Sequence, residues 1–392
     1  MKIAIVGAGI SGIMAAYYLV KAGHNVTVID QEPYAAMRTS YANGGQVSVS
    51  NSEVWNTLSN VKKGIKWMLR KDAPLLIRPT IEWAKIKWLT KFLYHTVKGD
   101  YTVNTAETIR LGIESRELYQ QAISEEKIVD FDQINCGILH FYKDRQYFKT
   151  AVAAKDIYEA NGCEWTILDK KKLKAIEPAI SDVGIIGGVW TAADWVGDIH
   201  KFCYELAETL QKKYNVEFYY NTASVDLVVL AQDFDAVVVS AGIGSIKLAN
   251  TIGDSLPIYP VKGYSITINN VDPGLLPRTS LLDDQAKIVA SPLGNRLRVA
   301  GTAELAGENY DIRSDRIKPL LDWVHVNFPQ INTHDYQSWA CLRPMTPNMM
   351  PIVQQSQNNT KIFYHTGHGH LGWTVSPATA KQLTHLIETA TI

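Results

Sequence analysis

Apolar and polar positions at the start of the chain predict a strand, a turn, a helix and a second strand. Residues 2–6 form a short apolar run typical of a buried strand, and residues 11–21 follow with a helical pattern. Gly23 ends this helix, and residues 25–29 form a second strand pattern that runs into Asp30. This order predicts a βαβ unit, in which one helix joins two neighbouring parallel strands.

The remaining pattern combines helices, buried strands and an antiparallel region. Helices are predicted at residues 107–125, 198–213 and 316–328 and from about Pro377, and strands at residues 216–220, 235–240 and 362–365. Between residues 259 and 301, short β-rich runs alternate with Gly, Pro and Asn, which is typical of antiparallel sheet. Residues 33–52 are small and polar and predict a loop, on the surface or around a ligand. The predicted fold class is therefore α/β with an α+β part.

Composition narrows the classes of protein that remain. The chain has 392 residues, of which 46% are hydrophobic and 20% charged, so we expect a globular protein of roughly two or three domains. Lys plus Arg and Asp plus Glu both number 39, and this zero balance does not indicate nucleic-acid binding. The four cysteines lie far apart and match no metal-ligand spacing, which favours reduced thiols in a cytoplasmic protein and no metal site.

The apolar N-terminal stretch also has an interpretation as a signal peptide, because Lys2 precedes a largely apolar run that reaches Val20. Glycines at positions 7, 9 and 12 interrupt this run, and no small-residue cleavage site precedes Asp30. A strand, a turn and a helix describe it better. No run in the chain approaches the ~18 apolar residues that a membrane-spanning helix needs.

The turn inside the βαβ unit carries a dinucleotide-binding pattern. Gly7, Gly9 and Gly12 form a GxGxxG sequence after the first strand and at the start of the helix. The first glycine suits a tight turn, the second lets the backbone approach a pyrophosphate, and the third lets helix and strand pack closely. Asp30 ends the second strand, where a carboxylate accepts hydrogen bonds from ribose hydroxyls and crowds a 2′-phosphate. The unit predicts a dinucleotide site and disfavours NADP.

The motif alone does not choose between NAD and FAD. It begins at residue 7, which we interpret as leaving no room for a preceding catalytic domain, and residues 241–244 give only a partial second match. Both features favour FAD, because a flavin enzyme that takes electrons directly from its substrate needs a single nucleotide site. An NAD-binding or non-catalytic Rossmann protein remains the alternative from these residues alone.

Longer stretches resemble the bacterial D-amino-acid dehydrogenases, the membrane-associated branch of the D-amino-acid oxidase and glycine oxidase superfamily. The likeness covers nearly the full length and begins with the N-terminal fingerprint through Asp30. Beyond it, the matching motifs are Thr39-Ser40-Tyr41-Ala42-Asn43-Gly44-Gly45-Gln46, Ile65-Lys66-Trp67-Met68, Tyr259-Pro260-Val261-Lys262-Gly263-Tyr264-Ser265, Leu342-Arg343-Pro344-Met345-Thr346-Pro347 and Thr366-Gly367-His368-Gly369-His370-Leu371-Gly372-Trp373-Thr374. The last two are the most specific. The sequence departs from glycine oxidases at Ile288, where they carry a substrate-contacting tyrosine.

The resemblance implies FAD as the cofactor and two domains made of interleaved segments. We expect a Rossmann-like FAD-binding domain from residues 1–54, 145–255 and 335–392, and an antiparallel-sheet substrate domain from residues 55–144 and 256–334. The cofactor-binding residues that the match implies are Gly7, Gly9, Ile10, Ser11, Gly12, Asp30, Gln31, Ser40, Asn43, Gly44, Gly45, Gln46, Val225, Ala241, Gly242, Gly367, His368, Gly369, Leu371, Gly372, Trp373 and Thr374. Backbone amides of the C-terminal glycine-rich loop are expected close to the flavin ring.

Arg343 is the residue that the resemblance implies for substrate binding. The matching arginine of the superfamily pairs with the substrate carboxylate, and a planar guanidinium suits this role because it forms two parallel charge-assisted bonds. A structural or surface arginine is the alternative. His370, Lys262 and Tyr264 are also expected at the active site, and period-two alternation places Lys262 and Tyr264 on one face of their strand.

The activity implied is FAD-dependent oxidative deamination of D-amino acids, such as D-alanine and D-proline, to 2-oxo acids and ammonia. The hydride of Cα would pass to flavin N5, and electrons would leave to a membrane quinone from a cytoplasmic protein held peripherally on the inner face of the cytoplasmic membrane. An amine oxidase of the glycine or sarcosine type, which uses O₂ and releases hydrogen peroxide, is the alternative.

Residues 55–98 form a basic, Trp-rich segment. It holds four of the ten tryptophans and ten Lys or Arg against two acids, a local net charge of +8. Lysines and aromatic residues share one predicted helix, namely Trp83, Lys87, Trp88, Lys91, Phe92, Tyr94 and Lys98. Such a helix suits a lipid headgroup surface, with rings inserted and amines reaching phosphates. A solvated helix packed on the domain is the alternative.

Overall fold

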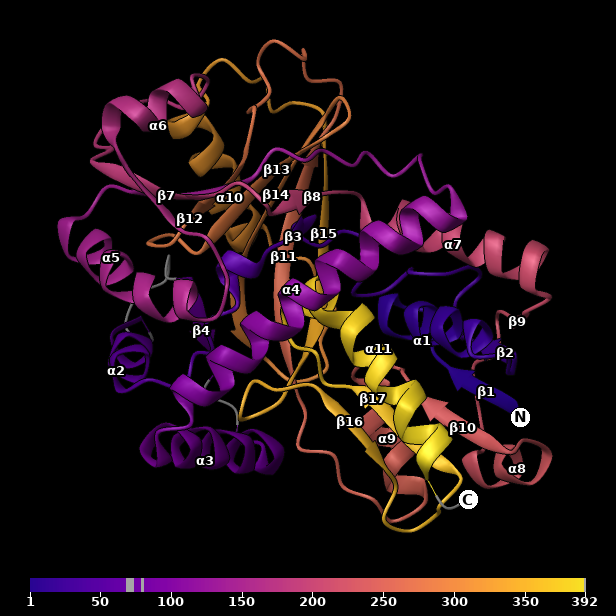
Figure 1. Ribbon diagram of the computed structural model, residues 1–392. Helices are drawn as coiled ribbons and strands as arrows, with labels where there is room; N and C mark the ends of the chain where they lie inside the picture. The colour runs from indigo at the N-terminus through magenta and orange to yellow at the C-terminus, as the bar shows by residue number, and fades with distance from the viewer. Residues whose placement is uncertain (68–73, 79–80, 391–392) are drawn as a thin grey trace.

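The computed structural model describes residues 1–67, 74–78 and 81–390, and its helices surround two large sheets (Figure 1). Within this part of the chain, the smaller sheet has the strand order β16 (Ile352–Gln355), β17 (Ile362–Thr366), β10 (Ala236–Val239), β1 (Lys2–Val6), β2 (Asn25–Ile29) and β9 (Glu217–Tyr219). Neighbouring strands run parallel except at the β16–β17 edge. The sheet is covered on both faces, which is why β1 reads as a continuous apolar run.

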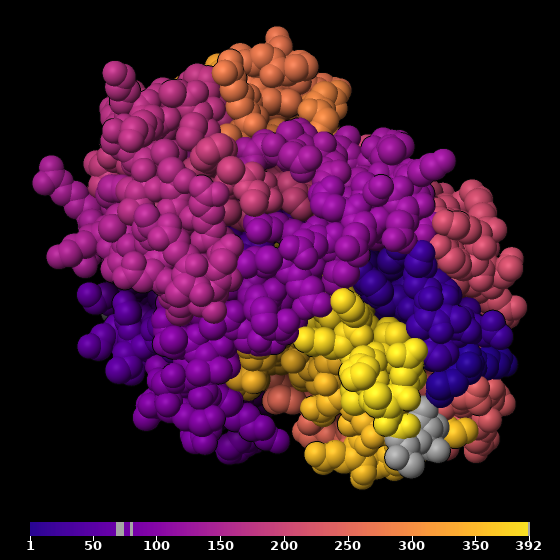
Figure 2. Space-filling model, viewed as in Figure 1, coloured from indigo at the N-terminus to yellow at the C-terminus, as the bar shows by residue number. Residues whose placement is uncertain are grey.

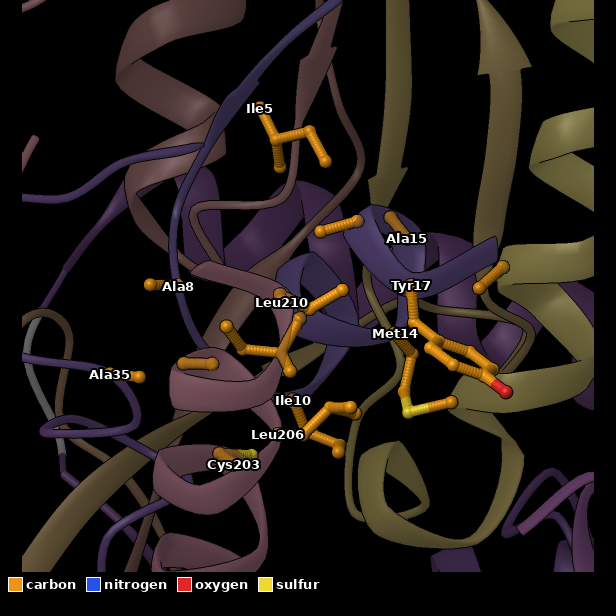
Figure 3. Packing of buried hydrophobic residues seen from close by; sticks show 14 of the residues in the cluster. Ile5, Ala8, Ile10, Met14, Ala15, Tyr17, Ala35, Cys203, Leu206 and Leu210 are labelled. Atoms are coloured by element: carbon orange, nitrogen blue, oxygen red, sulfur yellow. The ribbon is translucent and has the colours of Figure 1, made fainter. Parts of the chain in front are cut away.

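Helices on the two faces of the smaller sheet form separate cores. The helices α1 (Ile10–Lys21), α7 (Ile199–Tyr214) and α11 (Gly372–Thr389) pack on one face, and α8 (Leu227–Asp233) and α9 (Gly244–Thr251) pack on the other. Figure 3 shows Met14 of α1 close to Leu206 and Leu210 of α7. The predicted βαβ unit is therefore confirmed, with its helix buried against a second helix.

The larger sheet contains the antiparallel region that the sequence predicted. Its order is β15 (Tyr336–Met345), β11 (Tyr259–Ile268), β14 (Arg296–Leu305), β13 (Ile288–Leu293), β12 (Ser280–Asp283), β5 (Ile138–Tyr142), β7 (Gly187–Thr191) and β6 (Thr166–Asp169), with β4 (Leu75–Ile77) beside β14. Only the β5–β12 and β4–β14 pairs in the described part of this sheet are parallel. The helix α10 (Ser314–Asn327) packs on β11 and β14.

The remaining elements connect and cover the two sheets. These are β3 (Gln46–Val47), the 3₁₀ turn η1 (Val49–Asn51), α2 (Leu58–Trp67), α3 (Trp83–Lys98), α4 (Tyr101–Glu126), α5 (Arg145–Ala160), α6 (Lys170–Ile176) and β8 (Trp195–Val196). The long helix α4 crosses the molecule and packs against both α5 and α11 (Figures 1 and 2). No helix in the described ranges is long and apolar enough to cross a membrane.

Two expected domain boundaries need correction. Residues 145–255 and 335–392 were both assigned to the nucleotide domain, yet β6, β7 and β15 lie in the larger sheet. The physical reason is strand pairing, since β15 pairs with β11 along its whole length and β7 pairs with β5. The two sheets therefore share the C-terminal part of the chain.

The closing helix begins earlier than the sequence predicted. The predicted start is at about Pro377, but α11 starts at Gly372. Proline has no N–H to bond the carbonyl four residues before it, and that carbonyl, of Trp373, accepts from the Tyr119 hydroxyl at 2.7 Å instead. A side chain from α4 thus lets the helix continue through the proline.

Candidate active site

The GxGxxG turn joins β1 to α1 with little free space. Gly7 has a φ of +111°, and a Cβ there would lie 2.6 Å from the Ser240 carbonyl oxygen. A Cβ on Gly12 would lie 1.8 Å from the Gly7 carbonyl oxygen. Gly9 differs, because the nearest atom to its Cβ position is the Ser40 Oγ at 3.6 Å. Gly7 and Gly12 are thus required by the protein itself, whereas Gly9 keeps space open at the helix start.

Asp30 closes this turn from the end of β2. Its carboxylate accepts hydrogen bonds from the backbone N–H of Ala8 and, at 2.8 Å, from that of Glu32. Burial raises the pKa of Asp30, while the two backbone donors act in the opposite direction. Gln31 beside it is exposed, and Val225 lies half-buried next to the α8–α9 core. The carboxylate therefore holds the glycine turn in addition to any contact with a ribose.

The loop before β3 connects α1 to the larger sheet. The Ser40 hydroxyl accepts from the Ile10 backbone N–H at 3.1 Å, which ties the loop to the helix start. The Asn43 side chain accepts from the Gly45 N–H at 2.9 Å and so fixes the turn. The Gln46 amide donates to Ser280 Oγ at 2.7 Å, so this side chain is used within the larger sheet.

Three successive carbonyls of this loop are bonded to the larger sheet. The carbonyls of Ala42, Asn43 and Gly44 accept from Ser265 Oγ at 2.7 Å, Arg298 Nη1 at 3.0 Å and Ser291 Oγ at 2.7 Å. A Cβ on Gly44 would lie 2.6 Å from a methyl group of Val289. The loop therefore lies flat on β11, β13 and β14.

The C-terminal glycine-rich loop brings histidines to the start of α1. His368 bonds Ser11 Oγ at 3.2 Å through Nδ1 and Thr379 Oγ1 at 2.9 Å through Nε2. Burial lowers the pKa of His368 to about 3, so the ring is neutral at physiological pH. Gly367 and Gly369 have φ of +73° and +58°, which lets the loop turn sharply on either side of this ring.

Parts of this loop do not face a ligand as expected. The N–H groups of Gly369 and Leu371 donate to the carbonyls of Pro344 and His368 at 3.1 and 3.0 Å, so these amides are already used. Trp373 is 2% exposed and belongs to the core between α1, α4 and α7, so its side chain packs and does not line a cofactor surface. Thr374 Oγ1 accepts from the Ser48 N–H at 3.2 Å, and Gly372 only begins α11.

The remaining groups around the turn fit a dinucleotide. Gly9 has no side chain to cap α1, so apart from the Ile10 N–H, which donates to Ser40, the first-turn N–H groups stay available to an anion. Gly242, next to Ala241, has a φ of +57° and no atom within 4 Å of its Cβ position. The buried Ser240 hydroxyl has no partner in the described part of the chain. Open backbone and an unsatisfied hydroxyl at the end of β10 are what a phosphate or ribitol chain would fill.

Arg343 lies on β15 with one hydrogen bond and no acidic partner among the described residues. Its Nη1 donates to the Thr302 carbonyl at 2.9 Å. Burial lowers the pKa of Arg343 to about 10, so the group stays charged at neutral pH. A half-buried guanidinium without a carboxylate is costly for a folded protein, and an anionic ligand would complete it.

His370 lies near this arginine. Its ring stacks on Trp55 at a centroid distance of 4.8 Å, and its Nε2 is buried without a partner among the described residues. Burial, with the charge of Arg343, lowers the pKa of His370 to about 3. The side chain is therefore a neutral, aromatic-stacked group beside a cation.

Lys262 and Tyr264 require a correction. They share one face of β11 as predicted, but it is the face opposite Arg343, because Arg343 pairs with Val261 in the β11–β15 ladder. Both side chains are buried toward Glu304, with the Tyr264 hydroxyl at 2.5 Å and the Lys262 Nζ at 3.7 Å from its Oε2. They belong to an internal ion cluster and do not reach the arginine.

Three residues around Arg343 and His370 were not expected from the sequence. Trp55, Gly263 and Thr302 contact these side chains from α2's leading loop, β11 and β14. Gly263 stands inside a motif already matched, which was the only available signal. Nothing in the local pattern distinguishes Trp55 or Thr302.

Comparison with known proteins gives the family. Residues 2–386 match the FAD dependent oxidoreductase (DAO) family. The chain is 45% identical over 407 residues to a protein named D-amino acid dehydrogenase 3 from Mesorhizobium japonicum, with 99% of this chain and 97% of that protein covered. It is 38% identical to the D-amino acid dehydrogenase of Dechloromonas aromatica, with the same coverage of both.

Solved structures show the same fold at lower identity. The glycine oxidase of Bacillus cereus superimposes with a TM-score of 0.75 at 18% identity, covering 99% of this chain and 94% of the other. The L-proline dehydrogenase of P. horikoshii gives 0.73 at 15% identity, covering 100% and 94%. With the glycine turn, Asp30 and the open end of β10 in place, the chain belongs to the FAD dependent oxidoreductase family.

Proposed function

We propose that this protein is a dehydrogenase of D-amino acids, such as D-alanine and D-proline, that yields 2-oxo acids and ammonia. The observation that carries the proposal is Arg343, a half-buried cation with no acid of its own in the described part of the chain. An amino acid always brings a carboxylate, so a single arginine recognises the whole substrate class. The names of the full-length relatives support the D configuration.

The protein's part in the reaction is to bind and orient. With Nη1 occupied by Thr302, the Nη2 and Nε edge of Arg343 is left for the two carboxylate oxygens. FAD, when bound, accepts the hydride from Cα, and water hydrolyses the resulting imino acid. Fixing the carboxylate limits the positions open to Cα, and such positioning supplies a large share of rate acceleration.

The histidines contribute as neutral groups in this proposal. The pKa values of His368 and His370 are both lowered to about 3 by burial, so neither carries a positive charge at neutral pH. His368 holds α1 against α11 through Ser11 and Thr379. His370 with Trp55 forms an aromatic wall near Arg343, suited to a substrate side chain.

The test is a panel of D- and L-amino acids assayed with an artificial dye and with O₂. Dye-dependent oxidation of D-amino acids without peroxide supports the proposal. Stoichiometric hydrogen peroxide would instead establish the oxidase alternative, and turnover of L-amino acids alone would overturn the stereochemistry. A purified protein without flavin absorbance would contradict both flavin-enzyme hypotheses.

We further propose a membrane quinone as the electron acceptor, reached from a cytoplasmic protein bound peripherally through α3. Trp83, Tyr94 and Val97 are 81%, 61% and 79% exposed on this helix, and Lys87 and Lys91 are exposed among them. Exposed apolar side chains with interleaved lysines suit an anionic lipid surface. Residues 68–73 of the basic segment, including Met68 of a matched motif, lie outside the described residues.

The expected set of lipid-facing residues is smaller than the sequence suggested. Trp88 is 7% exposed, donates to the Met345 carbonyl at 2.8 Å and stacks on Phe92, so both rings pack inward.

Sedimentation with vesicles of anionic and of zwitterionic lipid tests whether the exposed face of α3 binds a membrane. Trp83→Ser with Val97→Ser should reduce binding to anionic vesicles, whereas Val183→Ser, at an exposed position elsewhere, should not. Equal sedimentation of all variants would contradict the membrane proposal.

A further inference from the structure

Arg343 rests on a part of the sheet that is built around its guanidinium. A Cβ added to Gly263 would lie 2.3, 2.4 and 2.5 Å from Nη2, Cζ and Nη1 of Arg343. The guanidinium plane therefore lies directly on the backbone of β11, on the strand next to its own. Any other residue at position 263 would place a carbon atom where the guanidinium is.

The hydrogen-bond acceptor of Arg343 comes from an irregular position. Thr302 has a φ of +64°, the left-handed region that β-branched residues rarely adopt. The β11–β14 pairing shifts register between Lys262 and Tyr264, whose partners are Glu304 and Gly301. Thr302 and Ala303 therefore stand together opposite the single residue Gly263, in a β-bulge. The Thr302 carbonyl points at Arg343 Nη1 at 2.9 Å. Bulges re-aim single groups, and strained backbone concentrates at functional sites.

We propose that Gly263 and the Thr302 bulge are positioning residues that set the orientation of Arg343 for a carboxylate. This rests on the proposed function, in which the carboxylate is that of an amino acid. The backbone at Gly263 packs against the plane of the guanidinium, and the Thr302 carbonyl accepts a hydrogen bond from Nη1 at one end of the group. The remaining edge then points in one direction, which an arginine free to rotate about its side-chain bonds would not maintain.

Gly263→Ala is a selective test because the clash falls on a movable side chain. Gly263 has no positive φ, so alanine brings no backbone strain, and the atoms that must yield are the end of Arg343. We expect unchanged flavin content, a melting temperature close to wild type, and at least a tenfold weaker affinity for propionate. Propionate has the carboxylate of D-alanine but no amine, and its binding to the holoenzyme is followed by the change in flavin absorbance.

Gly188→Ala is the matched control in the same sheet. Its Cβ would lie 2.8 Å from the His140 carbonyl oxygen, a backbone atom that cannot move aside. This variant should have a lower melting temperature than wild type and the same affinity for propionate. A general defect of the sheet would instead change both variants in the same way, and that result would overturn the proposal.

Two further variants separate the contributions. Gly263→Ala added to Arg343→Met should not weaken propionate binding beyond Arg343→Met alone, because the two changes remove the same interaction. Thr302→Gly keeps the carbonyl and relaxes the backbone, so its propionate affinity should stay within threefold of wild type. Additive effects in the first case, or a tenfold loss in the second, would refute the assigned roles.

The outcomes also distinguish this proposal from the proposed function. A wild-type protein that oxidises no D-amino acid contradicts the function, whatever the variants do. A wild-type protein that oxidises D-alanine, with a Gly263→Ala variant that binds propionate normally and retains the KM of wild type, contradicts only the positioning roles. In the expected case, KM rises more than kcat falls.

Discussion

Replacing Arg343 by methionine should weaken substrate binding and stabilise the protein at the same time. Burial lowers the pKa of Arg343 to about 10 from its ordinary value of 12.5. Since one pKa unit corresponds to ~1.4 kcal/mol, keeping the charged form destabilises the folded state by about 3 kcal/mol. For a base with a lowered pKa, this penalty is fully present below about pH 10 and disappears as the pH rises from there toward 12.5.

The expected gain in the free energy of unfolding of Arg343→Met is smaller than the full cost of the buried charge. Methionine fills most of the same volume, but the Thr302 carbonyl loses its donor, which costs about 1 kcal/mol. The net stabilisation at pH 7 is then about 2 kcal/mol, or roughly 1–3 °C in the unfolding midpoint of a chain of this size. Substrate binding should lose about 2–5 kcal/mol, the range for removing one partner of a buried charge pair, which raises KM by roughly 30-fold or more.

The assay pairs thermal unfolding by circular dichroism with dye-coupled kinetics on D-alanine. Arg296→Met is the control, because Arg296 Nη2 lies 2.6 Å from Asp132 and 2.8 Å from Asp198. Those carboxylates raise the pKa of Arg296, so the control should lose stability and keep its KM. A destabilised Arg343→Met variant with an unchanged KM would refute the reasoning, because it would show that the guanidinium serves structure and not a ligand.

Three other predictions concern the cofactor side of the site. Gly12→Ala should prevent folding, since its Cβ would lie 1.8 Å from a backbone oxygen. Gly9→Ala should keep the circular dichroism spectrum of wild type and bind less flavin, measured by the ratio of flavin to protein absorbance. Asp30→Asn should weaken FAD binding about tenfold, followed by flavin fluorescence on dilution, because the ribose loses a charged acceptor worth ~1–2 kcal/mol. Because burial lowers the pKa of His368 to about 3, His368→Gln should leave the shape of the kcat/KM profile between pH 5 and 8 unchanged; loss of an inflection near pH 6.5 would contradict this.

The cofactor turn could be predicted from sequence because its causes are local. Gly7 and Gly12 belong to one continuous segment, and the atoms that exclude a side chain at Gly12 come from Gly7 itself. The sequence patterns for the strand, the turn and the helix therefore all lie within one short segment and predict the same structure. The start of α11 was missed because the partner that tolerates Pro377 is Tyr119, on a helix far away in the chain.

The substrate side could be predicted only in part. The burial pattern of β11 shows buried residues on both faces, so alternation identifies two faces without telling which one meets the ligand. The pattern therefore placed Lys262 and Tyr264 on one face of β11 without deciding which, and that face is the one opposite Arg343. The left-handed backbone of Thr302 had no signal at all, since threonine is among the residues least expected there. The backbone conformation of Thr302 follows from the pairing of β14 with β11, which are far apart in the chain.

The geometry of the site depends on the larger sheet more than on the nucleotide fold. The loop carbonyls of Ala42, Asn43 and Gly44 and the guanidinium of Arg343 all lie against one face of the larger sheet. The three carbonyls accept from β11, β14 and β13, and Arg343 pairs with Val261 of β11. The loop that faces the expected flavin and the arginine that faces the expected carboxylate thus share one rigid support. The smaller sheet joins them through the Ser40–Ile10 bond and the β-bridge between Met345 and His368. Small movements between the two sheets would therefore change cofactor binding before they change the alignment of the reacting groups.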